Sequence, residues 1–519
     1  MEFYFYVTAI KSRFLVSVIA NVLRAGITFA CGILIARGLN PVGYGELTFL
    51  LGSFVAIRAL VDMGSSSAFY TFISRRTRGD RFYFFYFLWL LLQFAITLAL
   101  VSLLIPSGLF EKIWLGQLRE TVALAFVAVF MQQQMWQMVG QIGESARKTI
   151  KVQLLNIAVA ITYLVISYLL FWLGDMSVQG ILWIMIGLYG TAAILSYLLL
   201  RERNAEPVEP EGTYRQMLGE YWAYCKPMIW LAVAGFFYAF ADKWMLQKFG
   251  GAAQQGYFQI ASQFAQISLL ATVSILNIFW KEIAEARARG EHGRVAILYT
   301  KINRGLVILS AVIAGLLLPW AKQIVAILLG PTYVKAWPIL AIMFLYPIHQ
   351  SMGQIGGTMF MAGGDTRKYV VLSIGLMLFT LPVSYLALAP SSGMLIPGLG
   401  LGAIGMAGYM VLTSIVAVNI QAWVLARHNA WQFDWQYQAV GIPLMIALGY
   451  AIKLLVGLVW ELDGVGWVEL LIPVVVACVV YAGSVVLVVK SLPWLIGMSK
   501  EEFNRMFLQL RKEFRHVGA

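Results

Sequence analysis

Hydrophobic residues in this chain form long runs, and polar residues gather in short stretches between them. A run of about 20 apolar residues is long enough to cross the hydrocarbon core of a bilayer as an α-helix. Counting such runs predicts about 14 transmembrane helices. They cover residues 14–37, 45–73, 82–105, 119–142, 152–173, 179–200, 223–247, 257–280, 305–328, 337–361, 369–389, 399–425, 438–460 and 467–489. The predicted fold is an all-α polytopic membrane protein.

The polar stretches divide this fold into five parts. The longest internal stretch, RERNAEPVEPEGTYRQ, is rich in Glu and Pro and is typical of a flexible cytoplasmic linker. At the end of the chain, Ser499 and Glu502 form a capping box before an amphipathic segment suited to a membrane surface. We therefore predict a six-helix lobe at 1–200, a linker at 201–222, a second six-helix lobe at 223–427, two appended helices at 428–490 and an amphipathic tail at 491–519.

Short sequence matches relate the two predicted lobes. Gly43-Tyr44 matches Gly256-Tyr257, Leu115-Gly116 matches Leu329-Gly330, and Arg147-Lys148 matches Arg367-Lys368. The matches occur in the same order, as expected after duplication of a transporter half. An even number of helices per half predicts a parallel repeat whose pseudo-twofold axis is the membrane normal.

Composition agrees with the membrane class, and the charge distribution gives an orientation. The chain is 60% hydrophobic and 12% charged, with a mean hydropathy of +0.77. Of its 38 Lys and Arg residues, 27 fall on the side that carries both termini and 7 on the other side. The positive-inside rule then places both termini in the cytoplasm. The net charge of +13 therefore reflects topology, and no nucleic-acid partner is expected.

Charged residues inside the apolar runs are the first candidates for function, because an ionised group in a bilayer is costly. Arg24 lies midway along the first run, and Arg58 and Asp62 lie one helical turn apart in the second. The spacing of Arg58 and Asp62 also allows a structural ion pair. Arg24 has no acidic neighbour in its own helix, so it requires a partner from another helix or a bound anion.

Glutamine residues form a second candidate set. Gln133, Gln137 and Gln141 recur every four residues in one run, and further amides occur at Gln263, Gln266 and Gln354. Such amides either join helices by hydrogen bonds or line a polar cavity. Together with the central arginines, amides in three of the predicted helices favour a cavity.

Four segments resemble the polysaccharide transport family of the multidrug/oligosaccharidyl-lipid/polysaccharide (MOP) exporter superfamily, the Wzx-type flippases. They are ARGLNPVGYGELTF, FADKWMLQKFGGAAQQGYFQIASQF, LLGPTYVKAWPIL and GGDTRKY. The resemblance covers the first twelve predicted helices. It implies alternating access between two lobes, and movement of an undecaprenyl-pyrophosphate-linked oligosaccharide from the cytoplasmic to the outer leaflet of the bacterial inner membrane.

The resemblance also assigns roles to residues. Arg24 and Arg58 are the expected pyrophosphate-attracting residues, with Lys226 as a weaker candidate that could simply mark a helix end. Asp242 and Lys243 stand where a gate or an ion-coupling site is expected, and a local salt bridge is the structural alternative. Membrane lipid and polysaccharide polymerase machinery are the further partners that the resemblance implies.

A small-molecule exporter and a membrane enzyme are the two alternative classes of function. An ion-coupled exporter of small molecules would use Asp62 or Asp242 for coupling, but central arginines disfavour its organic cations. A membrane enzyme requires acid, base or metal groups, usually on a sizeable loop, and we find no such constellation in the sequence. Cys31, Cys225 and Cys478 lack metal-ligand spacing. No metal, cofactor or catalytic residue is therefore expected.

Overall fold

The structure is a computed structural model of the 519-residue chain. It describes residues 2–200, 212–269, 276, 279, 282–283, 285–287, 289–362, 366–462 and 466–505. Most of the predicted linker (201–211) and of the apolar stripe of the tail (506–519) lies outside these residues. The predicted capping box is confirmed, since Ser499 N donates to Glu502 Oε2 at 3.0 Å and Glu502 N donates to Ser499 Oγ at 3.1 Å.

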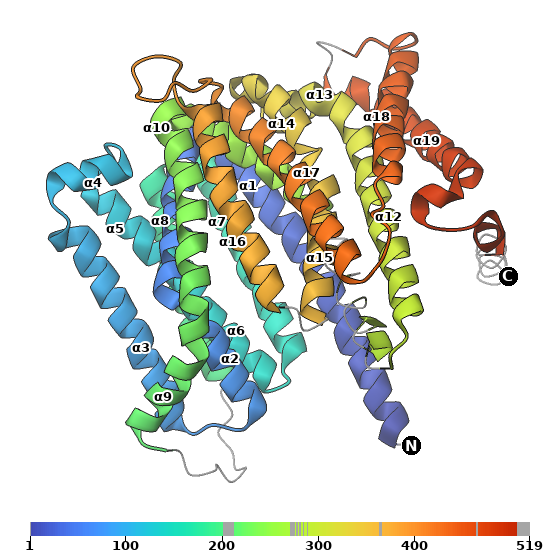
Figure 1. Ribbon diagram of the computed structural model, residues 1–519. Helices are drawn as coiled ribbons and strands as arrows, with labels where there is room; N and C mark the ends of the chain where they lie inside the picture. Colours follow the sequence, from blue (N-terminus) through green and yellow to red (C-terminus); the bar gives the residue numbers. More distant parts are fainter. Residues whose placement is uncertain are drawn as a thin grey trace. The chain divides into compact units, whose positions relative to one another are not determined.

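Long α-helices make up the chain, and no β-strand occurs in the described part (Figure 1). Within the described residues, eleven helical segments are long and apolar enough to cross a membrane. Two of them, Val16–Asp62 and Tyr214–Ser268, each extend from one predicted span into the next. The predicted span at 337–361 is divided into two shorter helices. The prediction of a polytopic all-α membrane protein is confirmed.

The chain forms two compact units. Unit 1 comprises Met1–Ile260 and Met377–Ala403, and unit 2 comprises Ala261–Leu376 and Ile404–Ala519. Each unit combines segments that are far apart in the sequence. The lobes predicted at 1–200 and 223–427 stay a prediction.

Unit 1 is built around a long helix, α1, which packs along α7 and α5. Its elements are α1 (Glu2–Asp62), α2 (Ser65–Arg75), α3 (Asp80–Ala99), η1 (Leu100–Leu104), α4 (Ser107–Trp114), α5 (Arg119–Phe130), η2 (Met131–Met135), α6 (Trp136–Ser145), α7 (Thr149–Leu173), α8 (Val178–Leu200), α9 (Tyr214–Cys225), η3 (Lys226–Met228), α10 (Ile229–Ser268) up to Ile260, and the C-terminal part of α16 (Thr366–Leu388).

Unit 2 is centred on α12, which packs against α15 and α18, while α18 packs against α19. Its elements are α10 from Ala261, α12 (His292–Leu317), η4 (Leu318–Trp320), α13 (Ala321–Leu328), η5 (Pro331–Ala336), α14 (Trp337–Met343), α15 (Tyr346–Ala362), α16 up to Leu376, α17 (Gly402–His428) from Ile404, α18 (Gln436–Gly457), α19 (Trp467–Ser491) and η6 (Pro493–Ile496). The predicted appended helices are therefore an integral part of unit 2.

Backbone angles reveal the internal repeat at two places. Asn40 interrupts α1 with φ 58° and ψ 172°, and Gly251 interrupts α10 with φ 80° and ψ 173°. Gly116 and Gly330 likewise share a φ of 85°. Pairing Asn40 with Gly251 also pairs Gly45 with Gly256, which shifts the predicted match of Gly43 to Gly256 by two residues. Equivalent backbone geometry thus supports the repeat and corrects its register.

The two repeat-related bends contact each other within unit 1. A Cβ on Gly45 would lie 1.7 Å from the carbonyl oxygen of Ala252, and a Cβ on Gly256 would lie 2.1 Å from that of Pro41. Only glycine permits this approach, because each obstructing atom belongs to backbone. The bend after the first span is therefore packed directly against the bend within α10.

We expect Gly45→Ala to destabilise unit 1, because the methyl group can be accommodated only by moving α1 away from α10. The cost should be roughly 1–3 kcal/mol, as for other overpacked sites. The midpoint of thermal unfolding of the purified protein in detergent measures it. Gly26→Ala is the matched control on α1, since a Cβ at Gly26 meets nothing within 4 Å. Equal midpoints for the two variants would show that the close crossing is unimportant.

Candidate substrate-binding site

The candidate site lies where the second predicted span is interrupted. Met63 and Gly64 adopt φ values of 45° and 87°, so the helix ends at Asp62 and restarts at Ser65. The second part of α1 begins at Pro41, whose fixed φ suits the first turn of a helix. Arg58 is carried in the last turns of α1, just before the interruption. The sequence predicted one continuous helix at 45–73, which is wrong at this point.

Arg58 is surrounded by neutral amides. Its Nη2 donates to Gln137 Oε1 at 2.7 Å, its Nη1 to Gln133 Oε1 at 3.3 Å, and its Nε to Gln134 Oε1 at 3.4 Å. These acceptors solvate the guanidinium without neutralising it, because an amide carries no net charge. Arg58 therefore keeps a full positive charge within a membrane-spanning segment.

A π-helical turn brings these amides together. Residues Met131–Met135 form η2 between α5 and α6, and the wider turn changes the faces on which neighbouring side chains lie. As a result Gln134 joins Gln133 and Gln137 around the guanidinium. Regular α-helical spacing had instead grouped Gln133 and Gln137 with Gln141, whose buried Oε1 has no hydrogen-bond partner.

Gln93 of α3 links this cluster to the helix interruption. It is 5% exposed, accepts from Gln134 Nε2 at 3.2 Å and donates to the carbonyl oxygen of Val61 at 3.1 Å. Carbonyl groups in the last turn of a helix lack partners within the helix, so Gln93 supplies one. Gln93 and Gln134 are not among the glutamines predicted from the sequence to form the site. A single amide in the middle of an otherwise apolar span was the signal for Gln93.

Asp62 accepts hydrogen bonds from Ser65 and Ser66 instead of pairing with Arg58. Its Oδ1 accepts from Ser65 Oγ at 2.8 Å, from Ser66 N at 3.0 Å and from Ser66 Oγ at 2.6 Å. These bonds satisfy a free N–H at the start of α2 and complement the helix dipole. Within the described residues no ion pair joins Arg58 to Asp62, so the alternative of a self-neutralised pair is wrong.

A small cavity lies beside Arg58 on the buried side. Its wall includes Arg58, Gln93 and Gln134 together with apolar residues of α1 and α5, and its volume of about 20 Å³ suits a single water molecule. The bond from Arg58 to Gln137, in contrast, lies on the exposed side of the cluster. A ligand larger than water does not fit this cavity, whereas the exposed side at Gln137 offers a route to Arg58.

Arg24 has an acidic neighbour on another helix. It is exposed on α1, its Nη2 donates to Asn21 Oδ1 at 3.2 Å, and Glu144 of α6 lies within its electrostatic range. Glu144 also interacts with the hydroxyl group of Tyr70. Glu144, which is not among the residues predicted from the sequence, is thus an acidic neighbour of Arg24, but no ion pair joins the two within the described residues.

The structure places the other candidates of unit 1 apart from this cluster. Lys226 is exposed in η3, next to Pro227. Asp242 is buried in α10 and accepts from Ser384 Oγ of α16 at 2.8 Å. The stem of Lys243 lies against α1, because a Cβ on Gly52 would be 2.3 Å from Lys243 Cε.

The remaining glutamines lie in unit 2. Gln266 Nε2 donates to Ser262 Oγ at 3.3 Å. Gln263 is partly buried, and the side-chain Oε1 of Gln354 is buried without a hydrogen-bond partner. These residues are described within their own unit, and a joint role with Arg58 stays a prediction. In the part of the chain that the structure describes, no group of His, Cys, Asp and Glu could hold a metal ion.

Comparison of the structure with solved structures shows the fold. The lipid II flippase MurJ, in an inward closed conformation, matches with a TM-score of 0.66 and 14% identity over 92% of this chain and 99% of that chain. An inward-facing multidrug resistance MATE family transporter of the MOP superfamily matches with a TM-score of 0.59 and 14% identity over 78% and 95%.

A MOP superfamily transporter from Pyrococcus furiosus matches with a TM-score of 0.53 and 14% identity over 81% of this chain and 96% of that chain. No protein-family model and no curated protein matches the sequence. These structural neighbours are transporters and flippases. The chain accordingly has the multi-pass all-α fold of MOP superfamily transporters.

A double-mutant cycle tests the separation of Arg58 from Asp62. We expect Asp62→Ala to lower the free energy of unfolding by about 1–3 kcal/mol, because it removes the bonds that begin α2. The coupling energy between Arg58→Ala and Asp62→Ala should stay below about 1 kcal/mol, because the two side chains are joined only indirectly, through Gln134, Gln93 and Ser65. Unfolding in mixed detergent micelles provides the four stabilities. A coupling energy well above that limit would mean that the two side chains do pair.

Proposed function

We propose that the protein is a flippase for an undecaprenyl-pyrophosphate-linked oligosaccharide, moving it from the cytoplasmic to the outer leaflet of a bacterial inner membrane by alternating access. One observation carries the proposal. Arg58 is a guanidinium within a membrane-spanning segment whose hydrogen-bond acceptors are three neutral amides. Its charge is therefore available to an anion.

A pyrophosphate is the part of such a substrate that suits Arg58. Guanidinium groups bind phosphate oxygens through paired, charge-assisted hydrogen bonds. The exposed bond from Arg58 Nη2 to Gln137 is the one that an incoming phosphate oxygen would replace. Gln133 and Gln137 would then be free to bond sugar hydroxyl groups, while Arg24 adds positive charge at a second position on α1.

The fold supports transport of a lipid-linked substrate. The matching MurJ structure is described as a lipid II flippase, and lipid II is itself a lipid-linked molecule. The alternative, an ion-coupled exporter of small molecules, is suggested by the MATE structures of the same fold. Arg58 argues against organic cations as cargo, because a cation would be repelled by an unneutralised guanidinium.

Transbilayer movement in proteoliposomes tests this function directly. We expect Arg58→Ala to abolish movement of an undecaprenyl-pyrophosphate oligosaccharide, and Arg58→Lys to retain a small fraction, because lysine keeps the charge but not the paired geometry. Arg24→Ala should also abolish it without loss of folded protein.

Arg37→Ala is the matched control, since Arg37 is an exposed arginine on the same helix and should be dispensable. Full activity of Arg58→Ala would remove the basis of the proposal. Efflux of a cationic dye that requires Asp62 or Asp242, with no lipid movement, would favour the exporter.

Asp242 is the proposed coupling or gating residue, acting with Lys243. Asp242 is a buried carboxylate that accepts a hydrogen bond from a hydroxyl group. Binding of a proton or a small cation would neutralise its negative charge. We expect Asp242→Asn to remove any stimulation of transport by an imposed proton or sodium gradient while leaving exchange down the substrate gradient. Asp175→Asn, in an exposed connection, is the control. Unchanged stimulation in Asp242→Asn would exclude Asp242 from coupling.

A further inference from the structure

Unit 2 contains a cavity that none of the sequence candidates explains. It lies between the first turns of α12, the end of α17 and the connection that leads into α18. Its volume is about 410 Å³. Small-molecule sites in proteins are typically roughly 300–1,000 Å³, so the cavity has room for a ligand of one or two rings.

Aromatic side chains form much of its wall. Tyr299 of α12 and Trp431 stack with their ring centroids 5.5 Å apart and an interplanar angle of 28°. Phe433 and Trp435 follow on the same connection, and Trp435 is 53% exposed. Flat apolar faces of this kind pack against the C–H groups of a ring ligand.

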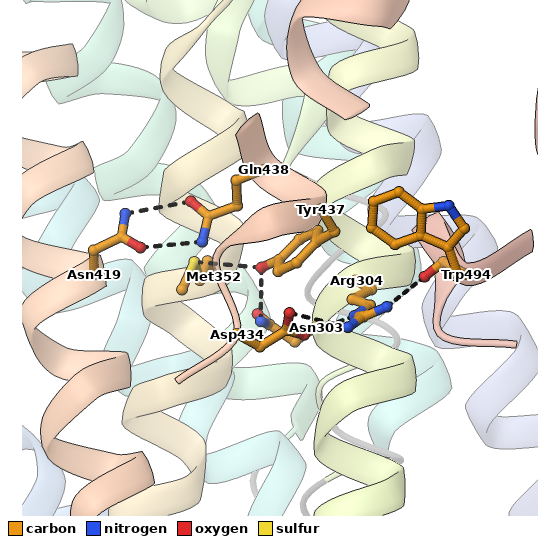
Figure 2. Close-up of polar contacts among 8 residues, drawn as sticks. All are labelled: Asn303, Arg304, Met352, Asn419, Asp434, Tyr437, Gln438 and Trp494. Carbon is orange, nitrogen blue, oxygen red and sulfur yellow. Dashed lines mark hydrogen bonds and ion pairs between the residues drawn. The ribbon is translucent and has the colours of Figure 1, made fainter. Parts of the chain in front are cut away.

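The charges at the cavity cancel each other. Arg304 Nε and Nη2 donate to the two carboxylate oxygens of Asp434 at 2.6 and 2.9 Å, and Nη1 donates to the carbonyl oxygen of Trp494 at 2.5 Å (Figure 2). An ammonium ligand would be repelled by Arg304 and a phosphate by Asp434. The electrostatics therefore favour a neutral ligand.

Asn303 supplies an unused hydrogen-bonding group. The residue belongs to the cavity wall and is 3% exposed, and its Nδ2 donates to Tyr437 Oη at 2.9 Å (Figure 2). Its Oδ1 has no hydrogen-bond partner among the residues that the structure describes. If the amide were turned, Nδ2 would be left unpaired instead, so one end lacks a partner in either orientation. An unpaired buried amide is costly, and a small rotation of the Asn303 side chain toward the cavity would let a ligand hydroxyl group relieve that cost.

We propose that this cavity binds a neutral sugar ring. Aromatic faces, amide groups and a cancelled charge pair together suit a molecule that has apolar C–H faces and a rim of hydroxyl groups. The glycan of the carrier lipid and a free saccharide share this chemistry. Only the first of these two sources rests on the proposed flippase function.

Saturation-transfer NMR on the full-length protein in detergent tests the site, with methyl β-glucoside, methyl β-galactoside and N-acetylglucosamine as probes. We expect transfer to the ring C–H protons of at least one probe. Asn303→Leu should weaken binding about tenfold, which corresponds to roughly 1.4 kcal/mol or one hydrogen bond. Trp435→Ala should also weaken binding, and it removes an exposed side chain that the fold does not bury.

Asn419→Leu is the matched control. Asn419 also belongs to unit 2 and exchanges hydrogen bonds with Gln438 at 3.0 and 3.3 Å, but it does not line the cavity (Figure 2). This variant should bind the probe as the unmodified protein does. Equal binding by all three variants, no transfer to any saccharide, or binding of phosphate or choline instead would overturn the proposal.

Competition identifies the source. Displacement of the probe by the lipid-linked oligosaccharide in nanodiscs assigns the site to the carrier glycan, and lack of displacement assigns it to a free saccharide. Both outcomes retain the sugar site. Because the transport assay depends on Arg58 and this assay does not, loss of probe binding with intact lipid movement would refute the sugar site alone. Probe binding without lipid movement would refute the flippase alone.

Discussion

The solvation of one guanidinium by side-chain amides is the interaction on which the candidate site depends. An arginine in an apolar span must find polar partners, and a carboxylate would satisfy it at the expense of its charge. Here Gln133, Gln134 and Gln137 provide acceptors without a countercharge. The π-helical turn at Met131–Met135 is what allows three neighbouring amides to converge. The site is thus stable when empty and still electrostatically attractive to an anion.

The helix interruption at Met63 and Gly64 places Arg58 and Asp62 in two different environments. Arg58 ends up among amides, and Asp62 begins the next helix by accepting from Ser65 and Ser66. Had the helix continued, the spacing of four residues would have favoured a pair between Arg58 and Asp62. Breaking the helix therefore frees the arginine, and Gln93 stabilises the break by bonding the carbonyl oxygen of Val61.

The fold and the site were predictable from the sequence to different degrees. Apolar runs determine membrane spans because the bilayer has a fixed thickness, so the spans at 152–173 and 438–460 agree with α7 and α18 to within a few residues. Arg58 was recognisable from its cost in the membrane. The partners of Arg58 were not, because regular α-helical periodicity cannot foresee a π-helical turn that changes the face of Gln134. Gln93 reaches the cluster through Gln134, and Glu144 lies near Arg24, each from another helix. Only tertiary packing determines such arrangements.

The two bends that meet in unit 1 bear on how such a fold could move. Asn40 and Gly251 share the same backbone angles, and Gly45 and Gly256 each approach a backbone carbonyl group of the opposite bend. A contact made by backbone alone has no side chains that could repack gradually. In any conformational change it must either persist or break as a whole. A contact that persists would act as a pivot. The two bends belong to the two halves of a parallel repeat, and such halves are related by a pseudo-twofold axis. Rupture would instead separate both close backbone approaches at once, with loss of their packing. The pivot is therefore the less expensive arrangement.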